Sequence, residues 1–424
     1  MRRFLYVLVA LFFPAVFLSA ADWAAFHGPD GNNKSPDTGL QKKWADGGPK
    51  LLWTADFIGF GYSGVAISGN KIYITGNVQR EGKDLSMVFC LDKNGKLIWE
   101  KDNGPAHTKV HLYPGTRGTP AVDSNFVYDI SATGEVTCYD TTKNGEKVWN
   151  RNLFREYNTP LPYWHLGNAV LIEGNYVIYP LGGHKHIAIA LNKKTGETVW
   201  GAEPVADPAG AVAGYVTPYA FDFEGIRAVT VMSDSTVEGF EAKTGKKLFS
   251  IPFRNRLVTN CTMPIYHNGC LFLTTGYDFG AKMFTLTKNV DGTINAAEVW
   301  YEKRFDNHHG GVILVGDYVY GSTFNGLWRS INFMTGEIGY TSRSFGKGSI
   351  HYADGLFYCL SEDDKTVGLV QPAPTEFIEL SHFELPNEAE GSSWAHPVVL
   401  DGRLYLRHAQ YLYCYDVLAQ NCEN

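Results

Sequence analysis

The stretch ALNKKTGETVW, residues 190–200, decides the fold of this protein. Its apolar start is typical of a strand that ends near Asn192, and Thr195-Gly196 then supplies a tight turn with a positive-φ corner. A second strand follows and ends in Trp200. The pattern returns as GFEAKTGKKLF at residues 239–249 and as SINFMTGEIGY at residues 330–340. Each copy predicts a β-hairpin whose terminal ring packs against a neighbouring unit, because an outer strand has little else to bury it.

The hairpin recurs along most of the chain. A large ring follows a glycine by four residues at Gly95/Trp99, Gly145/Trp149, Gly196/Trp200, Gly245/Phe249 and Gly336/Tyr340, and Trp300 fits through a longer turn. The rings are spaced by 50, 51, 49, 51 and 40 residues, a period typical of propellers and β-solenoids. One unit contains four strand candidates, at residues 119–123, 126–131, 135–139 and 147–150. Four short antiparallel strands form the blade of a β-propeller.

The two ends of the repeat region complement each other. Residues 394–400, 403–407 and 411–416 predict three strands, and no outer strand with a terminal ring follows them. GPKLLW, residues 48–53, predicts an outer strand without the three that should precede it. We therefore expect an all-β, eight-bladed propeller over residues 48–424, closed by the N-terminal strand and preceded by an extended lead-in at residues 22–47. Such closure removes an exposed sheet edge.

The N-terminus is typical of an export signal. Met1-Arg2-Arg3 precedes an apolar run over residues 4–17, and small residues follow up to Ala21. We interpret residues 1–21 as a cleavable signal peptide without a lipid-attachment cysteine, which predicts a periplasmic or secreted protein with no membrane span after cleavage. The net charge of −7 and the absence of a basic block argue against nucleic-acid binding.

The seven cysteines are an odd number for an exported chain. Cys90, Cys138 and Cys414 occupy the same position in different repeats. Equivalent strands of separate blades cannot bring their Cβ atoms within bridging distance. We therefore expect these three to be reduced and buried.

At ALNKKTGETVW and its copies the chain resembles the propeller repeat of quinoprotein alcohol dehydrogenases, with the pattern Ala-x-Asp-x-x-Thr-Gly-x-x-x-Trp. The hairpin CLDKNGKLIW is one residue shorter than that pattern, and CYDTTKNGEKVW is one residue longer. The opening WAAFHGPDGNNKSPDTGL, residues 23–40, is similar to the lead-in of exported bacterial "quinone-like" propellers. The same repeat also builds the scaffold propeller of the outer-membrane assembly machine. The resemblance therefore implies the fold and leaves the function open.

In the dehydrogenases this repeat carries pyrroloquinoline quinone (PQQ) over a tryptophan floor, with an Asp base and Ca²⁺ held by carboxylate and amide oxygens. This chain has no adjacent Cys pair and no C-x-x-C-H segment, and no Asp–Asn–Glu calcium set can be placed on matching positions. We therefore assign no catalytic residue, no metal ligand and no cofactor. PQQ with calcium belongs to the enzymatic alternative.

Ligand sites of propellers lie at a mouth of the central channel, where loops enter the innermost strands. Those loops contribute the candidate ligand mouth: Arg117, His165, Asn168, Thr262, His309, Trp394 and His396. Neutral imidazoles are good ligands for Zn²⁺ or Cu²⁺, and the basic side chains together form a positive focus that suits an anion. Binding of an anion should weaken above about pH 6.5 as the imidazoles lose their protons, unless they are metal ligands. In the alternative interpretation these side chains cap strand ends. Glu362, in the segment SEDDK at residues 361–365, is predicted to be solvated on a hairpin tip.

The favoured function is an exported binding or scaffold propeller without catalysis. Its ligand would be a protein or glycan partner, or a small anionic ligand at the central channel. Two alternatives remain: a PQQ- and calcium-dependent oxidoreductase acting on an alcohol or sugar, and a metal-dependent hydrolase that uses the mouth histidines.

Overall fold

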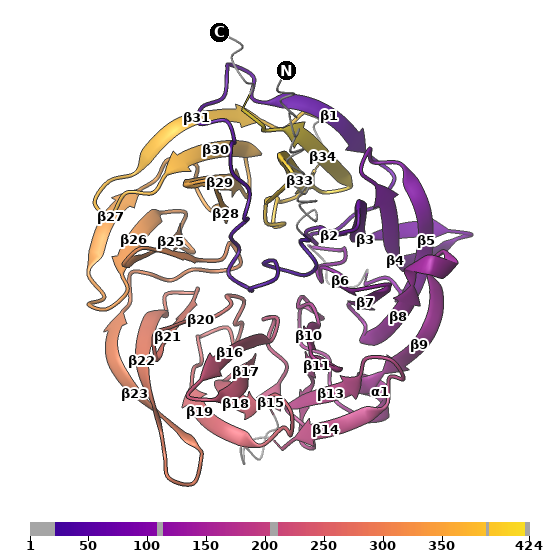
Figure 1. Cartoon of the computed structure of the whole chain (residues 1–424), viewed down its shortest axis with the longest axis vertical. Coiled ribbons are helices and arrows are strands. Elements are labelled where there is room, and N and C mark those ends of the chain that lie inside the picture. Colours follow the sequence, from indigo (N-terminus) through magenta and orange to yellow (C-terminus); the bar gives the residue numbers. More distant parts are fainter. Residues whose placement is uncertain (1–21, 108–112, 204–210, 387–389, 420–424) are drawn as a thin grey trace, which may run out of the picture.

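The computed structural model describes residues 22–107, 113–203, 211–386 and 390–419. Within them, eight four-stranded antiparallel sheets surround a central axis as the blades of a β-propeller (Figure 1). Helix in these residues is limited to α1 (Leu153–Glu156) and a short 3-10 turn. The predicted eight-bladed, all-β fold is therefore confirmed.

Each blade runs from a short innermost strand at the axis to a longer outermost strand. Blade 1 contains β2 (Ala66–Ser68), β3 (Lys71–Arg80), β4 (Lys83–Asp92) and β5 (Leu97–Pro105). Blade 2 contains β6 (Ala121–Asp123), β7 (Phe126–Ile130), β8 (Glu135–Asp140) and β9 (Glu146–Asn152). Blade 3 contains β10 (Leu171–Glu173), β11 (Tyr176–Pro180), β13 (Ala188–Asn192) and β14 (Thr198–Ala202). A two-stranded ribbon, β12 (Gly182–Gly183) with β15 (Ala211–Val212), flanks blade 3.

The remaining blades follow in chain order. Blade 4 contains β16 (Tyr219–Phe223), β17 (Ile226–Met232), β18 (Thr236–Glu241) and β19 (Lys247–Pro252). Blade 5 contains β20 (Ile265–His267), β21 (Cys270–Thr275), β22 (Gly280–Lys288) and β23 (Ile294–Glu302). Blade 6 contains β24 (Ile313–Val315), β25 (Tyr318–Ser322), β26 (Trp328–Asn332) and β27 (Ile338–Ser342). Blade 7 contains β28 (Gly348–Ala353), β29 (Leu356–Ser361), β30 (Thr366–Gln371) and β31 (Ile378–Glu384).

Blade 8 is built from both ends of the repeat region. It contains β32 (Val398–Leu400), β33 (Arg403–His408) and β34 (Tyr411–Asp416), with β1 (Lys50–Ala55) as its outermost strand. β1 pairs antiparallel with β34, from Lys50 opposite Asp416 to Ala55 opposite Leu412. The pairing predicted from the two incomplete repeats is thus present.

A β-bulge aims the tryptophan of an outermost strand at the next blade. In blade 3, Trp200 pairs with Ala190 and Thr198 with Leu191, so Val199 between them has no partner. Val199 is left exposed, whereas Trp200 is buried. Blades 1 and 2 shift register in the same place, just before their own rings. A bulge bends its strand and reorients side chains, which here turns the ring away from its own sheet.

The tryptophan that follows the bulge packs over the turn glycine of the next blade. A Cβ atom added to Gly196 would lie 2.7 Å from the Trp149 ring, and the same glycine has a φ of 73°. Equivalent pairs are Trp53/Gly95, Trp99/Gly145, Trp200/Gly245 and Trp300/Gly336. The Trp149 indole also donates to the Lys193 carbonyl of that turn at 3.0 Å. Glycine is therefore required both for its left-handed backbone and for the space its missing side chain leaves, and the predicted packing between blades is confirmed.

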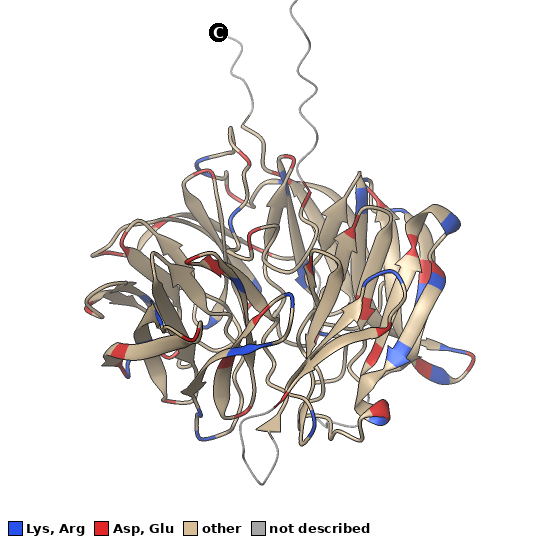
Figure 2. Cartoon of the chain, turned by 60° about the horizontal axis from the view of Figure 1, so that its bottom comes forward, with Lys and Arg blue, Asp and Glu red and all other residues tan. Residues whose placement is uncertain are grey.

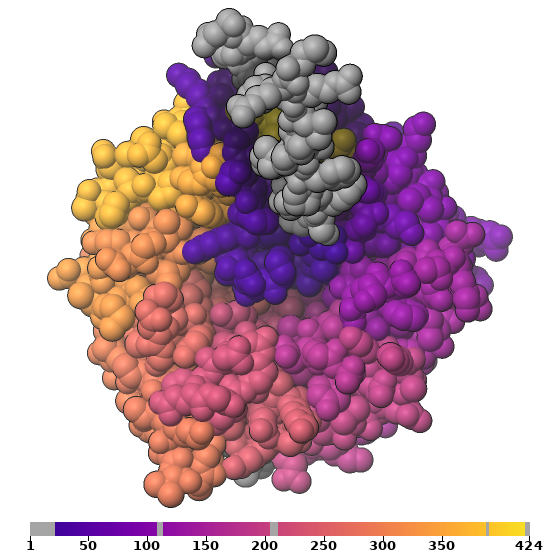
Figure 3. Space-filling view, in the orientation of Figure 1, coloured from indigo at the N-terminus to yellow at the C-terminus, as the bar shows by residue number. Residues whose placement is uncertain are grey.

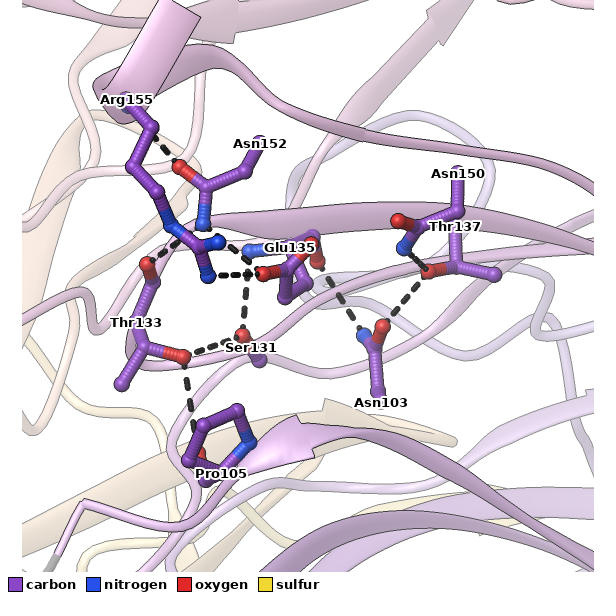
Figure 4. Close-up of polar contacts among 9 residues, drawn as sticks. All are labelled: Asn103, Pro105, Ser131, Thr133, Glu135, Thr137, Asn150, Asn152 and Arg155. Atoms are coloured by element: carbon purple, nitrogen blue, oxygen red, sulfur yellow. Dashed lines mark hydrogen bonds and ion pairs between the residues drawn. The ribbon is translucent and has the colours of Figure 1, made fainter.

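Polar side chains also join neighbouring blades. Asn103 of β5 donates to the Glu135 carbonyl at 3.2 Å and accepts from the Thr137 hydroxyl at 2.6 Å (Figure 4). Asn150 of β9 donates to the same hydroxyl at 2.6 Å. Because Asn103 is fully buried, each of these bonds satisfies a group that would otherwise be costly to desolvate.

The lead-in segment, residues 22–47, lies along one face of the ring and crosses its centre (Figures 1 and 3). It bonds to innermost strands of three blades: Trp23 N–H to Ile67 O at 2.9 Å, Val122 N–H to Ala24 O at 2.7 Å, and Ser35 N–H to Tyr352 O at 2.8 Å. Trp23 is 1% exposed. The lead-in is therefore part of the folded structure.

The three repeat-position cysteines are free and buried, as predicted. Cys90, Cys138 and Cys414 lie opposite Trp99, Trp149 and Trp53 in their sheets. Burial raises the pKa of each thiol to about 12, which removes the reactive thiolate.

We expect these three thiols to resist iodoacetamide in the native protein and to react fully after denaturation. Peptide mass spectrometry of the two samples measures this directly. Labelling of Cys90 or Cys138 under native conditions would contradict the blade packing, as would a disulfide among the three.

Candidate functional site

The candidate mouth is a ring of loops that enter the innermost strands from one end of the channel. Its most organised part is a group of aromatic side chains around Trp394, which precedes β32. The Tyr62 ring stacks on the Trp394 ring with centroids 4.4 Å apart. The centroid of the Tyr113 ring lies 4.7 Å from that of Trp394. The Arg117 guanidinium lies 5.7 Å above the Tyr62 ring. Arg117 and Trp394 are thus brought together through Tyr62, which lies in one of the loops expected at the mouth, and Tyr113 adds a ring that was not expected there.

Arg117 is a cation without a carboxylate partner in the described part of the chain. Its guanidinium donates to two backbone carbonyls, of Trp164 at 3.1 Å and of Tyr113 at 2.7 Å. These bonds fix its direction without neutralising its charge. Burial lowers the pKa of Arg117, but a guanidinium stays charged across physiological pH. The charge of Arg117 is therefore oriented by the backbone and is not compensated by a described carboxylate.

Glu362 joins the neighbouring side of the mouth, and its predicted place on a solvated hairpin tip is wrong. It is 8% exposed, because the loop after β29 turns inward. Its carboxylate lies 2.9 Å from Lys347 Nζ and 3.2 Å from His309 Nε2, and it accepts from the Trp394 indole at 2.9 Å. Burial would raise the pKa of Glu362, but the contacts with His309 and Lys347 outweigh it and hold that pKa well below its usual range. Glu362 is therefore ionised, and its negative charge is already compensated by the neighbouring Lys347 ammonium.

The mouth histidines do not supply the positive charge expected of them. Burial lowers the pKa of His309, despite the opposing contact with Glu362, and burial also lowers the pKa of His165. The His165 ring stacks on His107, with centroids 3.7 Å apart. Burial thus favours the neutral form of both imidazoles, so an anion held by them would be released at a lower pH than the expected value of about 6.5. Positive charge at the mouth comes from Arg117 and Lys347.

Asn168 and Thr262 are enclosed within the protein. Asn168 is 1% exposed, and its side chain lies beside the Tyr179 hydroxyl. The Thr262 hydroxyl bonds to the Asn307 side chain at 2.9 Å and to the His308 carbonyl at 2.5 Å. The alternative interpretation, that such residues hold the loops, therefore fits Thr262, whereas the Asn168 side-chain amide has no hydrogen-bond partner among the described residues.

His396 turns away from Arg117 and contacts the lead-in segment. Its Nδ1 lies 3.0 Å from His27 Nε2, and its Nε2 donates to the His309 carbonyl at 2.8 Å. Nearby, Asn33 lies 2.9 Å from His351 Nδ1 and donates to the Ile350 carbonyl at 2.6 Å. Burial lowers the pKa of His396 to about 4, so the cluster is neutral and holds the lead-in in place.

The mouth residues do not fit PQQ and calcium. One face of Trp394 is covered by Tyr62, and its N–H is bonded to Glu362, so the indole is no open floor for a planar quinone. A calcium ion at Glu362 would lie beside the Lys347 ammonium. Over the described ranges, no group of three or more His, Cys, Asp or Glu side chains is arranged to hold a metal ion. The metal-dependent alternative thus gains no ligand set there.

In the described part of the chain, no helix is both long enough and apolar enough to cross a membrane. Charges of both signs are interspersed over the face seen in Figure 2.

Solved structures share the fold across different activities. BamB from Moraxella catarrhalis superposes with a TM-score of 0.59 at 14% identity, covering 87% of this chain and 99% of that one. Quinohemoprotein alcohol dehydrogenase from Comamonas testosteroni gives 0.58 at 12% identity, covering 95% and 82%. The computationally designed protein Ika8 gives 0.56 at 11% identity, covering 87% and 100%. At these identities the likeness shows the fold alone.

No curated protein matches the sequence. A family model described as outer membrane protein assembly factor BamB matches residues 85–378, more than half of the chain. That span runs from blade 1 into blade 7 and includes the hairpins that carry the repeat. The chain therefore belongs to the PQQ-type propeller repeat family, whose model is described as outer membrane protein assembly factor BamB.

Proposed function

We propose that this protein is an exported, non-catalytic binding propeller that receives an acidic segment of a protein partner at its channel mouth. The observation that carries the proposal is Arg117, a guanidinium fixed by two carbonyls and left without a carboxylate in the described residues. An acidic side chain of a partner would complete its charge pairing. The aromatic rings around it would supply apolar contact area at low entropic cost.

The chemistry of the mouth favours binding over catalysis. A general base should have a pKa near the working pH, whereas the pKa of Glu362 is held far below it. The neutral His309 lies against Glu362, which already pairs with Lys347. The family description, an assembly factor, supports a protein partner over a glycan. The export signal expected at residues 1–21 lies outside the described residues and would place the protein in the periplasm or outside the cell.

Replacement of Arg117 should weaken binding of an acidic peptide. The probe is a fluorescein-labelled (Glu-Phe)₃ peptide, followed by fluorescence anisotropy. We expect Arg117→Gln to weaken it about tenfold or more, since a charge-assisted hydrogen bond contributes about 1.5–3 kcal/mol. Affinity should fall with added salt and stay level between about pH 6 and 8, because the charge resides on a guanidinium.

The matched control is Arg343→Gln, which removes an exposed arginine from a turn after β27 and should bind as the wild type does. A (Lys-Phe)₃ peptide tests the sign of the charge. Equal binding of both peptides, or unchanged binding by the Arg117 variant, would remove the basis of the proposal. A bound chromophore after addition of PQQ and Ca²⁺ would favour the oxidoreductase instead.

A further inference from the structure

Away from the mouth around Arg117, a cavity lies between the lead-in segment and the innermost strands of blades 4, 5 and 6, on the face shown in Figure 3. Its volume is about 180 Å³. Met263, Ile265 and Leu314 contribute apolar walls, and the Tyr219 and Tyr266 rings contribute flat ones. Pockets for drug-sized ligands measure about 300–1,000 Å³, so this cavity suits a smaller molecule of roughly one aromatic ring.

Lys34 supplies the cation of this cavity. Its side chain is half-buried, and among the described residues no carboxylate lies within ion-pair distance of its ammonium. The ammonium lies 5.8 Å from the centre of the Tyr352 ring. Asp30, the acidic residue of the lining, is exposed to solvent, and His27 is occupied by His396. Partial desolvation of an unpaired ammonium is unfavourable, and a bound carboxylate would offset it.

The wall that the lead-in provides is held by contacts within the protein. Gly31 packs against the Tyr219 ring so closely that an added Cβ would lie 3.3 Å from it. Ser35 bonds to β28, and Asn33, two residues earlier, donates its side-chain amide to the Ile350 carbonyl. A ligand would therefore not have to order this segment, and such preorganisation preserves affinity.

We propose that this cavity binds a small aromatic carboxylate, with its ring between the apolar and tyrosine walls and its carboxylate on Lys34. The site is separate from the mouth around Arg117 and does not depend on the function proposed for that mouth. The lead-in thereby contributes one wall and the charged group, and the blades contribute the apolar surface.

Methionine methyl NMR can locate the ligand. The chain has six methionines, of which Met263 lines the cavity and Met334 is exposed in the blade 6 hairpin turn. With ¹³C-methyl-labelled methionine, we expect phenylacetate to shift the Met263 signal in a saturable way and to leave Met334 unchanged. Phenethylamine, which has the same ring and the opposite charge, should not shift it. Absence of a Met263 shift with phenylacetate would overturn the proposal.

Two variants separate the charge from the walls. Lys34→Met keeps the aliphatic stem and should weaken phenylacetate about tenfold or more. Ile265→Trp should fill the cavity and abolish the shift while Lys34 remains. The control Lys194→Met changes an exposed lysine in the blade 3 turn and should bind normally. Equal binding by the Lys34 variant and the wild type, or equal shifts by the acid and the amine, would show that Lys34 does not select the ligand.

Discussion

Deletion of residues 22–55 is expected to abolish cooperative unfolding and to produce aggregates in size-exclusion chromatography. The deletion removes β1 and leaves β34 as an edge strand with unpaired backbone groups from Leu412 to Asp416. An open, apolar strand edge is a template for pairing with another chain. The deletion also removes Trp53, whose ring covers Gly95 of blade 1 and whose indole donates to Lys93 O at 3.1 Å.

A point variant keeps the chain length and tests the same junction. Trp53→Ala should lower the free energy of unfolding, measured in urea titrations, by about 2–3 kcal/mol. This value is at the low end for a large-to-small substitution, because Trp53 is only half-buried. Leu52→Ala, next to it and exposed, should change stability by less than about 0.5 kcal/mol. A monomeric deletion variant with an unchanged melting transition would disprove closure through β1.

Replacement of Arg407 is expected to destabilise the same junction from inside. This β33 residue is 2% exposed, and its guanidinium donates to carbonyls of Thr75 in blade 1 at 2.6 Å, of Gly59 in the loop between β1 and β2 at 3.1 Å, and of Ala409 in its own blade at 3.1 Å. It also bonds to the Ser63 hydroxyl at 2.7 Å. Arg407→Met fills similar space but leaves these acceptors unpaired, and it should cost roughly 3–5 kcal/mol.

Urea unfolding followed by tryptophan fluorescence measures this loss. Arg407→Lys should recover part of it, since an ammonium is charged but cannot reach several carbonyls in the same plane. Arg343→Met, an exposed change of the same chemistry, serves as the control. If the Arg407 and Arg343 variants unfold at the same urea concentration, the buried guanidinium does not join the blades.

The blades and their closing strand could be predicted because their signal is local. A turn glycine, a ring four residues later and strands of matching length lie within one stretch of about fifty residues. The same rules apply in most blades, so an error in one repeat does not mislead the others. Blade 5 shows the limit: Gly292 occupies the corner of its turn, and no ring covers it.

The mouth could be predicted only in part, because its contacts join residues far apart in the chain. Alignment of loops placed Tyr62, Arg117 and Trp394 at the mouth, but it could not show that the Tyr62 ring lies between the other two, 332 positions from Trp394. Glu362 lies among four polar or charged residues in the sequence, a pattern that ordinarily indicates a solvent-exposed segment. Its burial follows from the path of the whole loop. The lowered pKa of His309 could not be predicted either, since it depends on burial that the local sequence does not encode.

The lead-in segment has a consequence for how molecules reach the axis. It bonds to the innermost strands of three blades, at Ile67, Val122 and Tyr352, and its His27 contacts His396 just before β32. Because the segment crosses the centre of one face of the ring (Figure 1), a molecule that approached the axis from this face would first have to displace those hydrogen bonds.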